Sequence, residues 1–336
     1  MMPYTHRPLD RSPLNIDPYA NDPGHWGASL VNVAEIMLAC LDAAGAKSVT
    51  EVGAYAGDLT GLLMRWAEGS GARVTAVDPA PRRPLERLEE ESGLELVRQT
   101  SHDALRQVPM PDAVVLDGDH NYYTVSGELR LIGERAQGKD LPLILMHDVC
   151  WPHARRDTYF DPDQVPDEYR QPIVEGAGLF PGEPGVRTGG LPYKWAAGRE
   201  GGDRNGVLTA VEEFVASRDG LRLVVVPAFF GLGVIWHGDV GYAKNVKQVL
   251  APWDDDPVVE RLEANRVLHL ASSHFHLTEA NALREQKARQ EAVLRRLLES
   301  SAFSVAERLS RLRQRLGIAT EQSVVSKADV RGVLPD

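Results

Sequence analysis

The sequence predicts an α/β fold, with a mostly parallel sheet, an antiparallel hairpin at its C-terminal end and a helical C-terminal extension. Three observations predict it. Residues 48–66 read as a buried strand, a glycine turn and an apolar helix; further strand-like runs alternate with helical stretches; and two apolar runs near residue 230 are joined by a short link. Strand–helix alternation implies crossovers and parallel strands, whereas a short link implies an antiparallel pair.

The elements are expected in the following order. A helix should begin at Leu30 and end before Gly45, because apolar residues recur there at helical spacing. Parallel strands are expected at Ser48–Val52, Arg73–Val77, Leu94–Gln99, Ala113–Leu116 and Leu143–Met146, and helices between them at Leu59–Ala67, Pro84–Glu91, Asp103–Gln107 and Val125–Ala136. A helix at Val207–Arg218 and the hairpin strands Leu221–Val226 and Gly231–Trp236 complete the sheet domain.

Composition divides the chain into an N-terminal arm (1–24), a sheet domain (25–238) and a helical extension (239–336). The long stretch at 151–205 interrupts the sheet domain and is rich in proline, glycine and aromatic residues. It leaves from the carboxyl end of the fifth strand, where ligands bind in open α/β sheets. We expect a substrate lid there, with disorder as the alternative.

The extension is expected to be helical at Val258–Leu270 and Thr278–Leu316. The second stretch carries an apolar seam of coiled-coil type, formed by Leu298, Ala302, Val305, Leu309, Leu312 and Leu316. This seam favours either a homo-oligomer or a helix that packs on its own domain.

The bulk composition is that of a globular protein that works in a reducing, cytoplasmic environment. The chain has 336 residues, two cysteines and a formal net charge of −11. That charge disfavours nucleic acid as a partner, and two cysteines make no disulfide framework. The longest apolar run, residues 221–236, contains proline and glycine and is shorter than the ~20 residues that span a bilayer.

The first glycine turn is the motif around which a ligand site is expected. Gly53 and Gly57 allow close approach of backbone N–H groups, and Asp78 ends the next strand, where a carboxylate can bind a ribose. A dinucleotide fingerprint places a glycine where Tyr55 stands, so a pyrophosphate would be poorly served.

This E-x-G-x-x-x-G pattern resembles motif I of the class I S-adenosylmethionine (SAM) methyltransferases, whose fold is a Rossmann-like sheet with a C-terminal antiparallel hairpin. The resemblance implies SAM as cofactor. Trp26 or His25, just before the first helix, would then touch the ligand or pack the helix start. The implied cofactor-binding residues are Glu51, Gly53, Tyr55, Gly57, Asp58 and Asp78, with Ser101, His102 or Asp103 beside the adenine and Asp117 nearby. Asp103 is equally expected as a helix N-cap.

Polar residues follow the fourth and fifth strands, at neighbouring strand ends that face one crevice. Asp117, Asp119 and His120 follow the fourth strand, and His147 and Asp148 follow the fifth. Two carboxylates and a third ligand suit a hard cation such as Mg²⁺.

These motifs resemble a branch that includes metal-dependent sugar and macrolide O-methyltransferases. The resemblance assigns Asp117, His147 and Asp148 to the metal and Asp119 to the general base. His147 departs from the acid usual there, which leaves metal dependence open. Without a metal, His120 or His147 is the alternative base.

The preferred interpretation is a SAM-dependent O-methyltransferase that acts on a hydroxyl of a sugar or natural product. Two alternatives stay open. One is a hydroxylase-type or NAD(P)-linked oxidoreductase relative of the same fold, and the other is a non-catalytic assembly protein that works through its helical tail.

Overall fold

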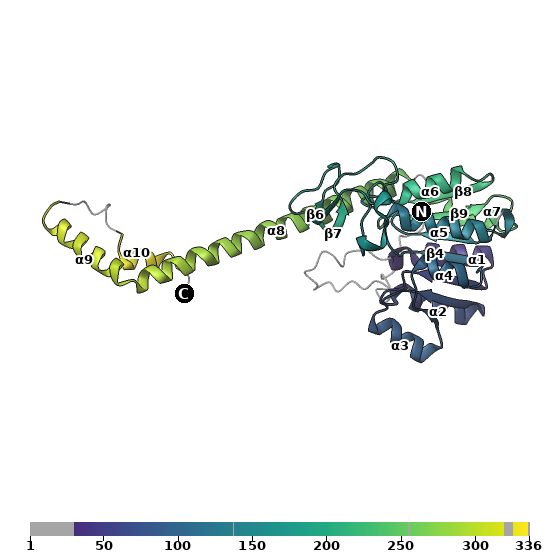
Figure 1. Cartoon of the computed structure of the whole chain (residues 1–336), viewed down its shortest axis with the longest axis horizontal. Coiled ribbons are helices and arrows are strands. Elements are labelled where there is room, and N and C mark those ends of the chain that lie inside the picture. The colour runs from purple at the N-terminus through teal and green to yellow at the C-terminus, as the bar shows by residue number, and fades with distance from the viewer. Residues whose placement is uncertain (1–29, 137, 255, 319–324, 335–336) are drawn as a thin grey trace, which may run out of the picture. The chain divides into compact units, whose positions relative to one another are not determined.

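The computed structural model of the chain describes residues 30–136, 138–254, 256–318 and 325–334 (Figure 1). The expected N-terminal arm, with His25 and Trp26, lies outside the described residues. The described chain divides into two compact units, the first ending at Phe275 and the second beginning at His276.

The first unit is built on a seven-stranded sheet of order β3-β2-β1-β4-β5-β9-β8. The strands up to β5 are parallel, and β9 pairs antiparallel with both β5 and β8. This confirms the predicted fold class. The strands are β1 (Ser48–Val52), β2 (Arg73–Val77), β3 (Glu95–Val97), β4 (Ala113–Leu116), β5 (Leu143–Met146), β8 (Leu221–Val226) and β9 (Leu232–His237).

Helices cover both faces of this sheet (Figure 1). A 3-10 turn at Leu30–Val33, α1 (Ala34–Ala44), α2 (Asp58–Ser70), α3 (Arg83–Ser92) and α7 (Ala243–Leu250) contribute to one buried apolar cluster. On the other face, α4 (Ser101–Gln107), α5 (Tyr122–Arg135) and α6 (Val207–Ala216) contribute to a second. Two buried cores therefore hold the strand ends in fixed positions.

The strand register places the ends of β1, β4 and β5 level with one another. Val52 pairs with Leu116, and Leu116 pairs with Met146. The next residues along each strand, Gly53, Asp117 and His147, therefore leave the sheet side by side. This register brings the glycine turn and the two polar motifs to the same, carboxyl-terminal end of the strands.

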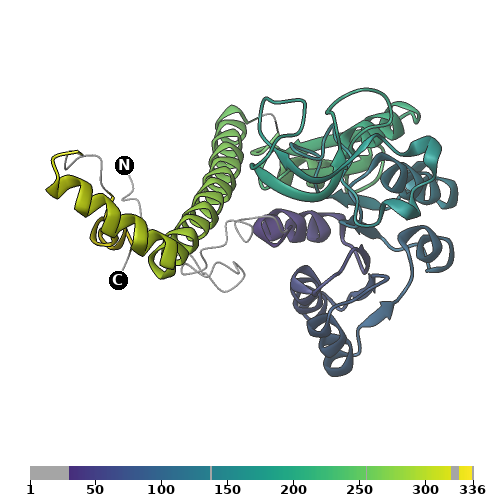
Figure 2. The same cartoon turned by 60° about the vertical axis from the view of Figure 1, so that its left-hand side comes forward.

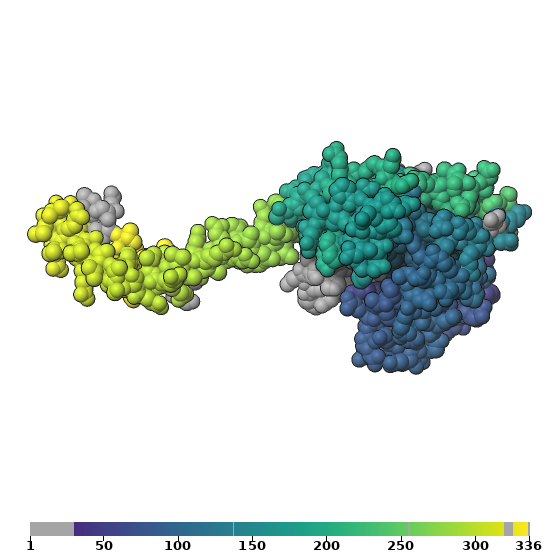
Figure 3. Space-filling model, viewed as in Figure 1, coloured from purple at the N-terminus to yellow at the C-terminus, as the bar shows by residue number. Residues whose placement is uncertain are grey.

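The insertion at 151–205 is folded rather than disordered. It contains an antiparallel hairpin that the sequence analysis missed, β6 (Ile173–Leu179) paired with β7 (Leu191–Ala197), and 3-10 turns at Pro162–Gln164 and Asp167–Tyr169. The guanidinium of Arg156, 1% exposed, donates to the carbonyls of Ala197, Pro184 and Gly185 and so ties the hairpin to its own loop. Figure 3 shows the insertion, in teal green, as part of the packed surface.

The first unit continues beyond Gly238, where we expected the sheet domain to end. Val246 and Leu250 of α7 are fully buried in the first core, together with Met37 of α1. The start of α8 (Pro257–Glu299) also belongs here, because Val267 and Leu270 pack with Phe230.

The prediction of one helix over Thr278–Leu316 is wrong in one respect. Helix α8, the long yellow-green ribbon in Figure 2, ends at Glu299. Ser300 breaks the helix because its hydroxyl caps α9 (Ser301–Arg315) by accepting from the Phe303 N–H. The second unit also holds α10 (Lys327–Gly332). Among the described residues, no helix is both long and apolar enough to cross a membrane.

Candidate functional site

The glycine turn after β1 lies against the end of β4. Gly53 has φ 89°, and a Cβ there would come 2.0 Å from the carbonyl oxygen of Asp117. Gly57 also has a positive φ, 86°, and Tyr55 between them has φ 42°. Only glycine fits at position 53 without displacing β4, because both the backbone conformation and the space exclude a side chain.

Asp78 ends β2 beside this turn. Its Oδ2 accepts from the Tyr55 N–H at 2.8 Å and its Oδ1 accepts from the Ala80 N–H at 2.8 Å. A carboxylate oxygen can accept a second hydrogen bond. Asp78 is therefore a buried carboxylate, 7% exposed, that holds the turn in place and keeps acceptor capacity on both oxygens.

The other expected residues of the turn lie at different depths. Glu51 is buried beneath it and accepts from Thr60 Oγ1 at 2.6 Å. Burial raises the pKa of Glu51 to about 8. Tyr55 and Asp58 are exposed on the outer side, and the Tyr55 ring lies 5.2 Å from the Arg82 guanidinium.

The start of α4 holds the three residues expected beside the adenine. Thr100, not Asp103, is the N-cap, since its Oγ1 accepts from the Asp103 N–H. The N-cap interpretation of Asp103 is therefore wrong: that residue lies in the first turn. His102 Nε2 contacts the Thr124 carbonyl at 2.9 Å, and its ring packs edge-on to Tyr123. In the described structure, His102 joins α4 to α5.

Ser101 lies near a buried acid that the sequence analysis missed, Glu128 on α5. Glu128 is 1% exposed, and its Oε1 has no hydrogen-bond partner among the described residues. Burial raises the pKa of Glu128 to about 8, and the Ser101 hydroxyl opposes that shift. No spacing signal marks this residue, because glutamate is ordinary on a helix.

The polar motifs after β4 and β5 form one charged cluster. It contains the expected Asp117, His120, His147 and Asp148, together with His153 from the insertion. His147 Nδ1 lies 3.0 Å from Asp117 Oδ1 and 3.3 Å from Asp148 Oδ2. His120 Nε2 lies 2.9 Å from Asp148 Oδ2. His153 escaped the sequence analysis although it follows Asp148 by only five residues.

His147 uses both ring nitrogens within the protein. Its Nδ1 contacts Asp117, and its Nε2 contacts the Phe229 carbonyl at 2.8 Å. Burial alone would lower the pKa of His147, but the Asp148 and Asp117 carboxylates hold it well above its usual value. Both ring nitrogens thus contact protein oxygens, so neither is free to bind a metal or to accept a proton.

His120 has a similar charge balance. Burial alone would lower the pKa of His120, but Asp148 and Asp117 raise it to about 10. The histidines in turn lower the pKa of the neighbouring acids. Burial would raise the pKa of Asp148, but His120, His147 and His153 hold it well below its usual value.

Asp119 instead accepts hydrogen bonds from neutral donors. Its Oδ1 accepts from the backbone N–H groups of His120 and Phe160, each at 3.0 Å, and its Oδ2 accepts from Asn121 Nδ2 at 2.7 Å. Burial raises the pKa of Asp119 above its usual value. Oδ2 keeps one free acceptor position, so this carboxylate is suited to take a proton.

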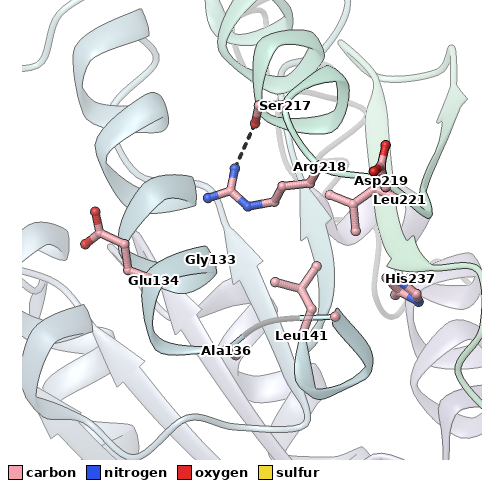
Figure 4. Close-up of a pocket in the computed structure, with 10 residues that line it drawn as sticks. Gly133, Glu134, Ala136, Leu141, Ser217, Arg218, Asp219, Leu221 and His237 are labelled. Atoms are coloured by element: carbon pink, nitrogen blue, oxygen red, sulfur yellow. Dashed lines mark hydrogen bonds between the residues drawn. The ribbon is translucent and has the colours of Figure 1, made fainter.

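A separate pocket of about 550 Å³ lies where β5 and β8 begin (Figure 4). Glu134, Arg218 and His237 are among its lining residues, and Arg218 donates to Ser217 Oγ at 2.9 Å. None of the expected site residues lines it. It lies at the amino-terminal end of the strands, whereas the charged cluster lies at their carboxyl-terminal end.

No protein-family model and no curated protein matches the sequence. Solved structures with a similar course of the chain include the S-adenosylhomocysteine-bound methyltransferase PaMTH1 of Podospora anserina, with 15% identity, 63% of this chain and 80% of that chain covered and a TM-score of 0.40. DesVI of Streptomyces venezuelae has 13% identity, 68% and 99% coverage and a TM-score of 0.38. NcsB1, an O-methyltransferase from neocarzinostatin biosynthesis, has 19% identity, 64% and 57% coverage and a TM-score of 0.36. The fold assignment rests on the strand order given above.

Proposed function

We propose that the chain is a SAM-dependent O-methyltransferase acting on a hydroxyl of a sugar or natural product. The observation that carries this proposal is that the glycine turn and the base lie at the same, carboxyl-terminal end of the parallel strands. The Gly53 turn with Asp78, and Asp119 beyond β4, follow strands whose ends are level. A cofactor above the turn and a base beside it would therefore reach one reacting centre.

In the proposed site the chain has three tasks. The Asp78 carboxylate would bind the ribose hydroxyls, and the turn at Gly53 would hold the cofactor close to the backbone. Asp119 would take the hydroxyl proton as the oxygen attacks the methyl carbon. SAM, when bound, would supply the methyl group and its sulfur would keep the electron pair of the broken bond, so the chain's task would be to hold the acceptor oxygen in line with the methyl carbon.

The acceptor class is proposed from the surface beside the base. The Phe160 ring is 68% exposed, and its own N–H donates to Asp119 Oδ1. An exposed aromatic ring next to the base can stack on an apolar ring or on the face of a sugar. A bulky hydroxylated ring would then present its hydroxyl to Asp119.

The three expected Mg²⁺ ligands suit metal binding less well than Asp119 suits the role of base. Asp117, His147 and Asp148 do lie together, but His147 has no nitrogen left for a metal, because both contact protein oxygens. The proposed methyl transfer therefore does not pass through Mg²⁺ at these three residues.

We also propose self-association through the second unit. Val305, Leu309 and Leu312 of α9 are each more than half exposed. A seam of exposed apolar side chains at three- and four-residue spacing is the pattern that helix pairing buries. The partner proposed is a second copy of this chain.

The proposed function is tested with labelled SAM, a panel of hydroxylated sugars and aromatic natural products, and a parallel titration with NAD(P)H. We expect S-adenosylhomocysteine to bind and label to reach at least one acceptor oxygen. Binding of NAD(P)H without binding of S-adenosylhomocysteine would favour the oxidoreductase alternative. Binding of neither would favour the assembly protein.

A further inference from the structure

Two histidines and one aspartate converge at the carboxyl end of β5 in an arrangement that shares only Asp148 with the expected Mg²⁺ set. They are His120 from the loop after β4, Asp148 directly after β5 and His153 from the insertion. Their ligand atoms all lie within 4.8 Å of one another. The loop after β4 and the segment after β5 thus supply one donor set.

The distances between these donor atoms are close to those of ligands around an ion. His120 Nε2 lies 2.9 Å from Asp148 Oδ2, and His153 Nε2 lies 3.6 Å from Asp148 Oδ1. Donor atoms held about 2.0–2.1 Å from a common metal lie roughly 2.8–3.4 Å apart, for octahedral or tetrahedral angles. Small side-chain adjustments would bring all three atoms into that range.

Two of these atoms are buried without a hydrogen bond. Asp148 is 2% exposed, and its Oδ1 has no hydrogen-bond partner among the described residues. His120 Nε2 is also buried, and its close approach to Asp148 lacks the alignment of a hydrogen bond. Buried polar atoms are nearly always satisfied, so the pair indicates a group that belongs between them.

The third donor is held by its neighbours. His153 Nδ1 contacts Thr158 Oγ1 at 3.0 Å, and the ring is 3% exposed. A metal-binding imidazole usually donates its other N–H to a protein oxygen, which fixes the tautomer. With the proton on Nδ1, the Nε2 lone pair faces Asp148 and the Tyr193 hydroxyl, 3.0 Å away.

We propose that His120, Asp148 and His153 bind one divalent transition-metal ion. Two imidazoles and one carboxylate form a donor set typical of iron, zinc or cobalt, whereas Mg²⁺ takes oxygen ligands. His147 stays outside this set because both of its ring nitrogens contact protein oxygens. The proposal concerns binding alone and stands whether or not methyl transfer occurs.

The test uses the full chain after treatment with a chelator. Co²⁺ binding is followed by its absorption spectrum, and Zn²⁺ and Mg²⁺ binding by calorimetry, without cofactor or acceptor. We expect one Co²⁺ or Zn²⁺ ion per chain, and a Co²⁺ absorption spectrum that indicates nitrogen ligands. Mg²⁺ should bind much more weakly. Equal affinity for Mg²⁺, or no Co²⁺ spectrum, would overturn the proposal.

Variants then assign the ligands. His153→Ala and Asp148→Asn should each weaken Zn²⁺ at least about 100-fold, because even residues that only orient a ligand are worth about 10- to 100-fold. Asparagine tolerates the left-handed backbone at position 148, where φ is 61°. Circular dichroism of each metal-free variant checks that it is folded.

Two controls separate a metal site from a hydrogen-bond network. His269→Asn, an exposed histidine on α8, should leave Zn²⁺ binding unchanged. Tyr193→Phe removes the hydroxyl that competes for His153 Nε2, so Zn²⁺ affinity should be kept or increased. Loss of affinity in Tyr193→Phe with none in His153→Ala would contradict the assignment of His153.

Discussion

The two carboxylates after β4 differ in their surroundings. Asp117 lies beside His147, so the tendency of burial to raise its pKa is overcome and its pKa is lowered. Asp119 accepts from neutral N–H donors, and burial outweighs these hydrogen bonds and the nearby His120, so its pKa is raised. A carboxyl group with a raised pKa is the better proton acceptor near neutral pH. The two residues are thus suited to different roles.

Replacement of Asp119 tests the base. Asp119→Asn keeps the shape and the hydrogen bonds to Oδ1 but removes the basic oxygen, so turnover should fall by about 10²- to 10⁴-fold. The affinity for S-adenosylhomocysteine should not change. Asp163→Asn, an exposed aspartate of the insertion, serves as the control. Turnover kept in Asp119→Asn would show that Asp119 is not the base.

The buried Glu51 makes a prediction about stability and pH. Its pKa is raised from 4.5 to about 8 by burial, so the folded state holds a proton that the unfolded state loses. Stability from this group is fully present below pH 4.5 and is lost as the pH rises through about 8. Glu51→Gln should therefore be more stable than the wild type above pH 8, by a few kcal/mol, and similar at low pH. Urea unfolding at both ends of this range measures the difference, and the exposed Glu68→Gln should show none.

At the scale of elements, five strands were predicted with their observed bounds. Those are β1, β2, β4, β5 and β8. The edge strand β3 is shorter than expected. The β6–β7 hairpin escaped prediction because Gly176, Gly178 and Pro192 obscure the alternation that marks a strand.

The charged cluster could be predicted only in part, for a related reason. The ends of neighbouring strands are readable from the sequence, which placed Asp117, Asp119 and His147 near one another. The approach of His153 depends on how the insertion folds back over β5, and the state of His147 depends on the Phe229 carbonyl from the β8–β9 link. Neither contact has a local sequence signal.

The glycine turn gives an element-scale prediction. Gly53→Ala should cost about 4 kcal/mol or more, because the backbone conformation is strained and the new Cβ would displace β4. The matched control is Gly71→Ala at the C-terminus of α2, where φ is 68° and no atom of the described residues lies within 4 Å of the added Cβ. That variant should lose only about 1–2 kcal/mol, the cost of a left-handed residue. Similar losses in thermal unfolding would contradict the close approach to Asp117.

At the scale of the whole molecule, packing places the boundary between the two units later in the chain than composition suggested. The change in composition after Gly238 suggested the end of the sheet domain, but α7 and the start of α8 complete the cores of the first unit. The second unit, from His276, keeps its α9 seam exposed. We predict from this that the first unit carries the site and the second unit carries self-association.

Deletion of residues 276–336 tests that division. The shortened chain should bind S-adenosylhomocysteine as the full chain does, because no expected site residue is removed. By light scattering, the full chain should be a dimer and the shortened chain a monomer. A shortened chain that stays dimeric would show that the seam is not the interface.

The most direct test of the account is calorimetric titration of S-adenosylhomocysteine into the full chain and into Asp78→Ala. The account predicts binding to the wild type at one site per chain. Loss of two ribose hydrogen bonds, each worth about 0.5–1.5 kcal/mol, should weaken binding by roughly 5- to 150-fold in the variant. No heat of binding in the wild type, or equal affinity in both proteins, would contradict it.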